Sequence, residues 1–210
     1  MNHDELSLRE EISAIGRQTV TSGLVKALSG NLSARLPGAD ECLITPTGDA
    51  LDALDPQELI RIGLDGQVRL GARRPSSEAP MHLAIYRRRP EINAIVHLHP
   101  PLATVVGTAL GAVRPMTFEG LHYIGEVGIV PALLPGSEEL GQATAAATDN
   151  SRVLVLQHHG SVCIGATLQE ALYRTIELEE TSRLIVIARA IGVEAYLPEW
   201  AIERLRGHGY

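Results

Sequence analysis

Two histidines stand two residues apart at the end of an apolar run. Residues 92–96 lead into His97 and His99, and two prolines then end the run. Because side chains alternate between the two faces of a β-strand, His97 and His99 point from the same face, with their Cα atoms about 6–7 Å apart. Two imidazoles on one rigid strand end can bind the same metal ion. Ordinary histidines also show this spacing, so a metal site requires further ligands elsewhere in the sequence.

Two other residues are candidates for those ligands. A second apolar run, residues 153–156, leads to His159, and Glu78 opens a predicted helix shortly before the first run. We assign the ligand to His159 and interpret His158 as a packing or hydrogen-bonding residue, since neighbours in a regular strand face opposite ways. Three histidines and one carboxylate are typical of a Zn²⁺ site, although Mn²⁺, Co²⁺ or Fe²⁺ also accept these donors. A glutamate beside such an ion can act as a general acid or base. His82, on the same helix face as Glu78, is interpreted as a structural histidine or a neighbour of the ligands.

Three pairs of small polar residues stand at predicted loops or helix starts. Backbone N–H groups and hydroxyls at such corners can bind a phosphate without a lysine. Each pair alone is more often an ordinary turn or helix cap, but together with a metal site the pairs predict a phosphate pocket. The pairs are Gly30-Asn31, Thr47-Gly48 and Ser76-Ser77.

Apolar periodicity and turn residues predict the elements that position these side chains. Strands and hairpins that come before and between helices favour an α/β fold, with a mostly antiparallel sheet covered by helices on both faces. Ser77 is expected to cap the second helix, and residues 111–136, rich in glycine and proline, give the weakest pattern. The expected helices are 5–28, 78–88, 101–109, one that Ser137 caps, 168–191 and 199–206; the expected strands are 31–36, 41–45, 59–64, 67–70, 92–99 and 152–157.

Composition narrows the class of protein. The chain has 210 residues, of which 45% are hydrophobic, enough for one domain over residues 1–210. The net charge is −7 and Lys26 is the only lysine, which argues against a nucleic-acid partner. No apolar run is long enough for a membrane span, and the N-terminus lacks the apolar stretch of a signal peptide. With Cys42 and Cys163 read as reduced, we expect a cytoplasmic protein with no membrane partner.

The candidate residues lie within motifs that occur in a fixed order along the chain. These are Ser29-Gly30-Asn31-Leu32-Ser33, Ile44-Thr45-Pro46-Thr47-Gly48, Pro75-Ser76-Ser77-Glu78, His82-x-x-Ile85-Tyr86, Ala94-Ile95-Val96-His97-Leu98-His99 and Gln157-His158-His159-Gly160. Together they resemble the class II aldolase/adducin family over about residues 5–190, and most of all its members that cleave L-fuculose 1-phosphate.

The resemblance implies a three-layer α/β/α fold and a homotetramer with its sites between subunits. It also implies Zn²⁺ held by His97, His99 and His159, with Glu78 alternating between metal ligand and catalytic acid or base. The phosphate of a small sugar substrate would then be bound by the polar pairs, through Asn31, Thr47, Gly48, Ser76 and Ser77.

The reaction implied by the resemblance is that of a lyase. A zinc-dependent aldolase would cleave a ketose 1-phosphate, such as L-fuculose 1-phosphate, to dihydroxyacetone phosphate and an aldehyde through a metal-stabilised enediolate. Glu78 favours this branch, because related epimerases carry aspartate there. The aldolases use a tyrosine between the two metal-binding strands, where this chain has Thr117 or Phe118; Tyr123 is offset, and Tyr210 in the tail is a candidate acid. The alternatives are a metal-dependent decarboxylase of a 3-oxo acid on the same fold and, less favoured, a non-catalytic adducin-like interaction domain.

Overall fold

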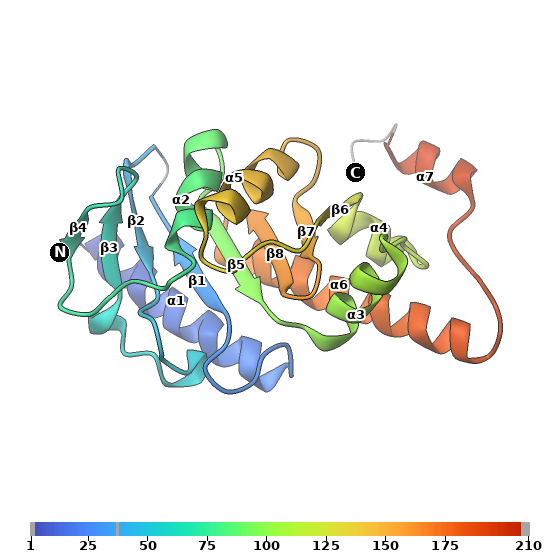
Figure 1. The fold of residues 1–210 in the computed structure, drawn as a ribbon, viewed down its shortest axis with the longest axis horizontal. Helices are drawn as coiled ribbons and strands as arrows, with labels where there is room; N and C mark the ends of the chain where they lie inside the picture. Colours follow the sequence, from blue (N-terminus) through green and yellow to red (C-terminus); the bar gives the residue numbers. More distant parts are fainter. Residues whose placement is uncertain (1–2, 37, 207–210) are drawn as a thin grey trace.

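The computed structural model describes residues 3–36 and 38–206, in which a central β-sheet lies between two layers of helices (Figure 1). The strands of these residues form one eight-stranded sheet in the order β4-β3-β2-β1-β5-β8-β7-β6. Neighbouring strands are antiparallel, except that β6 pairs with β7 in parallel. The strands are β1 (Asn31–Ala34), β2 (Glu41–Ile44), β3 (Ile60–Gly63), β4 (Val68–Leu70), β5 (Ala94–Leu98), β6 (Val127–Val130), β7 (Val153–Leu156) and β8 (Gly160–Gly165).

Helices cover both faces of this sheet. The helices α2 and α5 pack on one face, and α1, α3, α4 and α6 pack on the other, so the predicted three-layer α/β fold with a mostly antiparallel sheet is confirmed. The helices are α1 (His3–Thr21), α2 (Ala79–Arg88), α3 (Pro101–Leu110), α4 (Phe118–Ile124), α5 (Glu138–Ala147), α6 (Leu168–Ala190) and α7 (Glu199–Arg206), with 3-10 turns η1 (Leu51–Ala53) and η2 (Pro56–Glu58).

Strand β5 shows how the sheet directs the histidines. Ile95 packs with α2 and α5, whereas Val96 packs with α1 and α6 on the opposite face. His97 follows the alternation and therefore points to the α2 side, where it is fully buried. Asn31 of β1 lies directly opposite His97 in the register. The polar pair Gly30-Asn31 is thus brought next to the histidine pair by strand pairing alone.

Several boundaries differ from the prediction. The first helix ends at Thr21 rather than at residue 28, because Gly23 has a φ of +71° and the N–H groups of Gly23 and Leu24 bond back to the carbonyls of the last turn. Leu24 then turns into the core. The region 111–136 contains α4 and β6, and β8 directly follows the second histidine run; none of these three elements was predicted.

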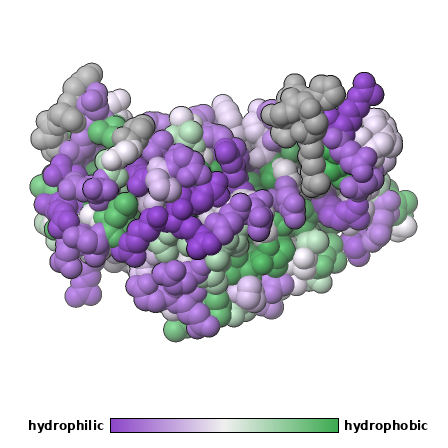
Figure 2. Space-filling model, turned by 90° about the horizontal axis from the view of Figure 1, so that it is seen from above, coloured by the Kyte–Doolittle hydropathy of each residue, from purple (hydrophilic) through white to green (hydrophobic). Residues whose placement is uncertain are grey.

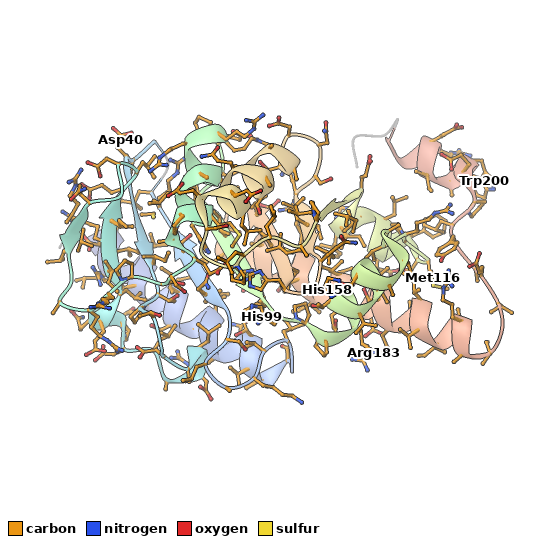
Figure 3. All side chains as sticks on the ribbon, viewed as in Figure 1. Asp40, His99, Met116, His158, Arg183 and Trp200 are labelled. Carbon is orange, nitrogen blue, oxygen red and sulfur yellow. The ribbon has the colours of Figure 1, made fainter. Side chains whose placement is uncertain are left out.

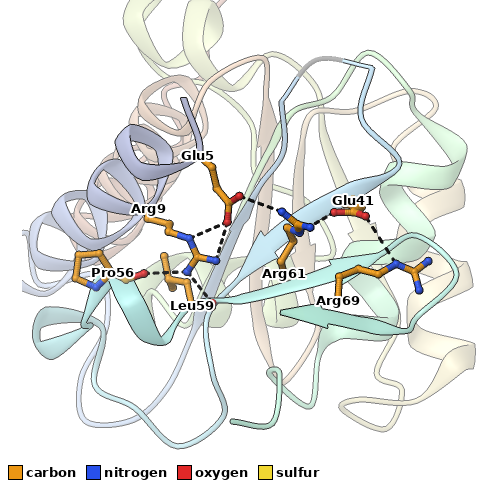
Figure 4. Close-up of polar contacts among 7 residues, drawn as sticks. All are labelled: Glu5, Arg9, Glu41, Pro56, Leu59, Arg61 and Arg69. Carbon is orange, nitrogen blue, oxygen red and sulfur yellow. Dashed lines mark hydrogen bonds and ion pairs between the residues drawn. The ribbon is translucent and has the colours of Figure 1, made fainter. Parts of the chain in front are cut away.

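An ion-pair network fastens α1 to the edge of the sheet (Figure 4). Arg9 is almost completely buried and donates to the Glu5 carboxylate and to the carbonyl oxygens of Pro56 and Leu59. Arg61 of β3 also pairs with Glu5, at 3.1 Å. Burial raises the pKa of Glu5, but the two guanidinium groups outweigh it, so the net shift is downward. The carboxylate is therefore held in its charged form between α1 and the sheet.

The distribution of hydrophilic side chains on the surface is that expected when the apolar residues are packed in an internal core. Figure 2 shows hydrophilic side chains over most of the face seen from above, with hydrophobic ones gathered right of centre. No helix among the described residues is long and apolar enough to cross a membrane.

Candidate metal centre

The three predicted histidine ligands come together at the middle of the sheet. His97 lies in β5, His99 directly follows it, and His159 lies in the turn between β7 and β8. The ring centroids are 4.8 to 5.0 Å apart, and one nitrogen from each ring lies within 4.8 Å of the other two. Figure 3 shows His99 near the centre of the molecule. Although His97 and His159 are 62 positions apart in the chain, they and His99 direct three nitrogen donors to one point.

The ring of His97 is oriented by a backbone carbonyl. Its Nδ1 lies 2.9 Å from the oxygen of Ser161 in β8. A carbonyl oxygen only accepts, so Nδ1 carries the proton and Nε2 keeps a free lone pair. In histidines that bind a metal through one ring nitrogen, the other ring nitrogen usually donates its N–H to an acceptor such as a backbone carbonyl. Nε2 of His97 lies 3.1 Å from Nε2 of His99, which places both donor atoms on the same side.

The turn that carries His159 depends on two unusual neighbours. His158 is exposed with a φ of +60°, and its backbone N–H donates to the Thr108 hydroxyl. It therefore lies in a tight turn rather than in a regular strand, which corrects the expectation that it packs on the opposite face. Gly160 lets β8 approach β5 closely, because a Cβ there would lie 2.4 Å from the Leu98 oxygen and 2.6 Å from the His99 ring.

Glu78 completes the group of donors. It occupies the N-cap position of α2, but its side chain makes no capping hydrogen bond, and its Oε2 lies 3.8 Å from His97 Nε2 and 4.0 Å from His159 Nε2. The predicted cap by Ser77 is wrong: the Ser76 hydroxyl accepts the Glu78 N–H instead. Burial raises the pKa of Glu78, although an N–H bond from Gly136 acts in the opposite direction.

A divalent cation fits this arrangement. Glu78 Oε2 is buried with no hydrogen-bond partner among the described residues, and it faces Nε2 of His97 and of His159. Ligands about 2.1 Å from one ion at tetrahedral angles lie about 3.4 Å from each other, close to the spacings among these donors. A cation between them would compensate the buried Glu78 oxygen, which otherwise lacks a partner.

The imidazoles are held in the form that binds metals. Burial lowers the pKa of His97 well below its usual value, and the neighbouring histidines add to this shift. Burial also lowers the pKa of His99, and burial together with His99 lowers that of His159 to about 4. All three rings are therefore neutral at pH 7, so their lone pairs are available to an ion.

One cavity joins this group to the predicted phosphate pocket. Its volume is about 290 Å³. No lysine or arginine is among its described lining residues, and Asp49 at its wall is bound by both terminal nitrogens of Arg73, each at 2.6 Å. Every residue of the three polar pairs reaches the cavity. The lining residues named by the sequence are Gly30, Asn31, Thr47, Gly48, Ser76, Ser77, Glu78, His97, His99 and His159.

His82 takes the structural role predicted as one of its two interpretations, with partners that the sequence did not reveal. It is fully buried, with Nε2 2.6 Å from Asn31 Oδ1 and Nδ1 2.6 Å from the Ser33 hydroxyl. Burial lowers its pKa to about 3, so the ring is neutral. Its spacing of four residues from Glu78 was the only local signal, and it did not indicate Asn31.

No described tyrosine lines the cavity. Thr117 caps α4 by accepting the Gly120 N–H, and Phe118 is exposed. Tyr123 contacts Tyr173 on α6 and lies beside a different pocket. The candidate acid Tyr210 lies outside the described residues. Within the described part of the chain, the tyrosine position of the aldolases is therefore not filled by a tyrosine.

Comparison with known proteins agrees with this geometry. Residues 10–186 match the family described as Class II Aldolase and Adducin N-terminal domain. This chain belongs to the class II aldolase/adducin family.

Among its relatives, the 3-oxo-tetronate 4-phosphate decarboxylase of Escherichia coli (strain K12) is 38% identical over 188 residues, which are 87% of this chain and 88% of the relative. The L-fuculose phosphate aldolase of Methanocaldococcus jannaschii is 32% identical over 179 residues, 85% of this chain and 96% of the relative. The crystal structure of YgbL from Escherichia coli is similar with a TM-score of 0.89 and 37% identity, covering 96% of this chain and 99% of that one.

These relatives define the class of activity. The chain is a metal-dependent lyase of the class II aldolase family, with a three-histidine site suited to a divalent ion. The expectation that aldolases for L-fuculose 1-phosphate are the most similar members is corrected, because the decarboxylase is 38% identical and the L-fuculose phosphate aldolase 32%. The homotetramer and the cytoplasmic location stay predictions.

Proposed function

We propose that this protein is a metal-dependent decarboxylase of a small 3-oxo acid with a phosphate at its far end, of the type of 3-oxo-tetronate 4-phosphate. The observation that carries the proposal is that one cavity of about 290 Å³ joins the three imidazoles and Glu78 to a corner of neutral hydrogen-bond donors. This volume is close to the lower end, about 300 Å³, of cavities that bind small ligands, as expected for a substrate as small as a four-carbon phosphate. The decarboxylase at 38% identity supports the choice of reaction.

The polar corner of the cavity would bind the phosphate. Hydroxyl, amide and backbone N–H groups can bind an anion through their dipoles, without a cationic side chain. The helix α2 begins at Ala79, with only Glu78 between it and the serine pair, and its N-terminus adds a favourable dipole. The proposed phosphate ligands are Gly30, Asn31, Thr47, Gly48, Ser76 and Ser77.

The donor group at the other end of the cavity would hold Zn²⁺ or a similar divalent ion. The ligands would be His97, His99 and His159, with Glu78 as the fourth before substrate binds. When bound, such an ion supplies a Lewis acid for a carbonyl oxygen. The hydrogen bond from His97 Nδ1 to the Ser161 oxygen keeps that ring oriented throughout.

The proposed reaction breaks one carbon–carbon bond. In 3-oxo-tetronate 4-phosphate the carboxylate is C1, C2 carries a hydroxyl, C3 is the ketone and C4 carries the phosphate. When the C1–C2 bond breaks, its electron pair stays at C2 and is delocalised onto the C3 oxygen, and CO₂ leaves. One proton then adds to C2, which gives dihydroxyacetone phosphate.

Glu78 is the proposed source of that proton. Burial raises the pKa of its carboxyl group, which favours the protonated form that a general acid needs. The carboxyl group lies beside the imidazoles, with Oε2 3.8 Å from Nε2 of His97. With substrate bound, the Glu78 carboxylate would take up one proton from solvent, which its raised pKa favours, and would then deliver that proton to C2.

The carboxyl groups that line the cavity favour decarboxylation over cleavage of a ketose 1-phosphate. Retro-aldol cleavage requires a base for the leaving hydroxyl in addition to the proton that adds to carbon. The two carboxyl groups among the described lining residues are Glu78 and Asp49, and Asp49 is engaged by Arg73. Decarboxylation needs only the single proton transfer that Glu78 can perform.

The test compares the two reactions on the same preparation. Metal-replete protein is incubated with 3-oxo-tetronate 4-phosphate and, separately, with L-fuculose 1-phosphate and other ketose 1-phosphates, and dihydroxyacetone phosphate and CO₂ are measured. We expect release of both products in equal amounts from the oxo acid, abolished by EDTA. Release of dihydroxyacetone phosphate with an aldehyde from a ketose 1-phosphate, and none from the oxo acid, would replace this proposal with the aldolase.

A further inference from the structure

A chain of buried hydrogen bonds connects α2 to the wall of the cavity. The Tyr86 hydroxyl lies 2.8 Å from the Ser33 hydroxyl, which lies 2.6 Å from Nδ1 of His82. On the other side of the ring, Nε2 of His82 lies 2.6 Å from Oδ1 of Asn31. Tyr86, Ser33 and His82 are at most 1% exposed, and Asn31 lines the cavity. We name Tyr86, Ser33, His82 and Asn31 the α2–β1 relay.

Only one assignment of the hydrogen atoms along the relay gives every donor an acceptor. Among the described residues, Ser33 is the only hydrogen-bond partner of the Tyr86 hydroxyl, so Tyr86 donates to Ser33. Ser33 then donates to Nδ1 of His82, and the remaining ring proton sits on Nε2 and is donated to Asn31 Oδ1. In the opposite direction the Tyr86 hydroxyl hydrogen would be buried without an acceptor among these residues, which is costly.

The direction of the relay fixes the Asn31 amide. Because Oδ1 is occupied by the N–H of His82, the NH₂ group is the polar end of Asn31 left for a ligand in the cavity. We infer that His82 is a positioning residue that holds Asn31 with its NH₂ group directed to an anionic ligand and its carbonyl oxygen directed away. This inference rests on the proposed function in that the anion is taken to be the substrate phosphate.

The relay addresses a difficulty of an anion site that has no lysine or arginine among its described lining residues. An amide that turns over presents its oxygen to the anion, and an acceptor facing a phosphate repels it. A lysine or arginine cannot present an acceptor in this way, whereas an asparagine needs a fixed partner to prevent it. The hydrogen bond from His82 supplies that partner from a fully buried position, where water does not compete.

The test changes His82 and measures binding of inorganic phosphate to the metal-replete full chain. His82→Leu removes both hydrogen bonds, and we expect phosphate Kd and substrate KM to rise about tenfold, as for loss of one hydrogen bond to a charged group, with kcat changed less than twofold. His82→Gln keeps an N–H donor and should recover most of the affinity. Ile85→Val is the matched control, because it loosens the core packing of the same helix without touching the relay, and it should bind phosphate as the wild type does.

A second measurement reads the relay without activity. In protein labelled with ¹⁵N-histidine, the resonances of His82 are identified by their absence from His82→Gln, and we expect the tautomer with the proton on Nε2. A proton on Nδ1, or unchanged phosphate affinity in His82→Leu, would overturn the inference even if the enzyme decarboxylates the oxo acid. If the wild type does not act on the oxo acid but His82→Leu weakens phosphate binding, the proposed reaction is wrong and the relay stands.

Discussion

Replacing Gly160 with alanine tests whether the close approach of β8 to β5 is what places His99. The added Cβ would lie 2.4 Å from the Leu98 carbonyl oxygen and 2.6 Å from the His99 ring, whereas an ordinary contact begins at 3.4 Å. The oxygen is therefore about 1 Å too close, and because it belongs to the backbone of β5 it cannot rotate away. Metal–ligand distances tolerate only about 0.2 Å, so a strand shift of this size should disturb the site.

We expect Gly160→Ala to lower metal affinity about 10- to 100-fold, as changes that misplace a ligand commonly do. Overpacking of this kind also costs about 1–3 kcal/mol of stability, which corresponds to roughly 2–4 °C in Tm for each kcal/mol. Metal affinity is measured by competition with a chromogenic zinc chelator, and stability by thermal unfolding of the metal-free protein.

The matched control is Gly165→Ala, at the other end of β8. Its Cβ would meet the Thr167 oxygen at 2.9 Å, and Gly165 pairs with Ala94 at the end of β5 remote from the histidines. This variant should lose stability but keep metal affinity. If Gly160→Ala loses stability while binding metal as tightly as the wild type, the approach of the two strands does not position His99 and the reasoning fails.

Four further variants test the site and its supports. Glu78→Gln should retain metal at reduced affinity and lose kcat about 10²- to 10⁴-fold. His159→Ala should lose metal and activity together. Metal content and kcat are measured on one preparation, and a fully active Glu78→Gln would contradict the acid role. Glu179 accepts the backbone N–H groups of Leu102 and Ala103, at 3.1 and 2.8 Å, in the first turn of α3. Glu179→Gln should therefore lower the free energy of unfolding in urea by about 1–2 kcal/mol, and no loss would show that the charged cap is dispensable. Because the pKa of Glu5 in the fold is below its ordinary value of 4.5, its charge stabilises the protein above that pH and the contribution is lost as pH falls through the lowered pKa. Glu5→Gln should therefore cost about 1–3 kcal/mol at pH 7 and progressively less below pH 4.5, and an undiminished difference in acid would rule out the charge as the cause.

Local signals predicted the elements whose cause is local. Ser137 and Thr167 cap α5 and α6 as expected, since each hydroxyl accepts an N–H three residues further on. Asp65-Gly66 forms the turn between β3 and β4, with Gly66 at a φ of +87°. In each case the residue and its partner lie within a few positions of each other, so the sequence alone contains the interaction.

The elements that were missed owe their existence to distant partners. The strand β6 is short and contains glycine, and it is held by parallel pairing with β7, about 26 residues further along the chain. The strand β8 lies between β5 and β7 and is buried along its whole length. The predicted cap at Ser77 is absent because the N-cap position of α2 falls on Glu78, whose side chain lies beside His97 instead of capping the helix. None of these effects leaves a local periodic pattern.

For the site, the sequence by itself determined the chemistry of the donors and one piece of geometry. Alternation along β5 places His97 and His99 on one face, and the types of residue present predict a divalent ion and an anion site without lysine. Only the tertiary structure decided that His159 and Glu78 meet that pair, and that Asn31 lies opposite His97 with its Oδ1 beside His82. The physical reason is that strand order and helix packing are set by burial of apolar faces over the whole chain, and contacts between remote segments have no signature in the residues near either one.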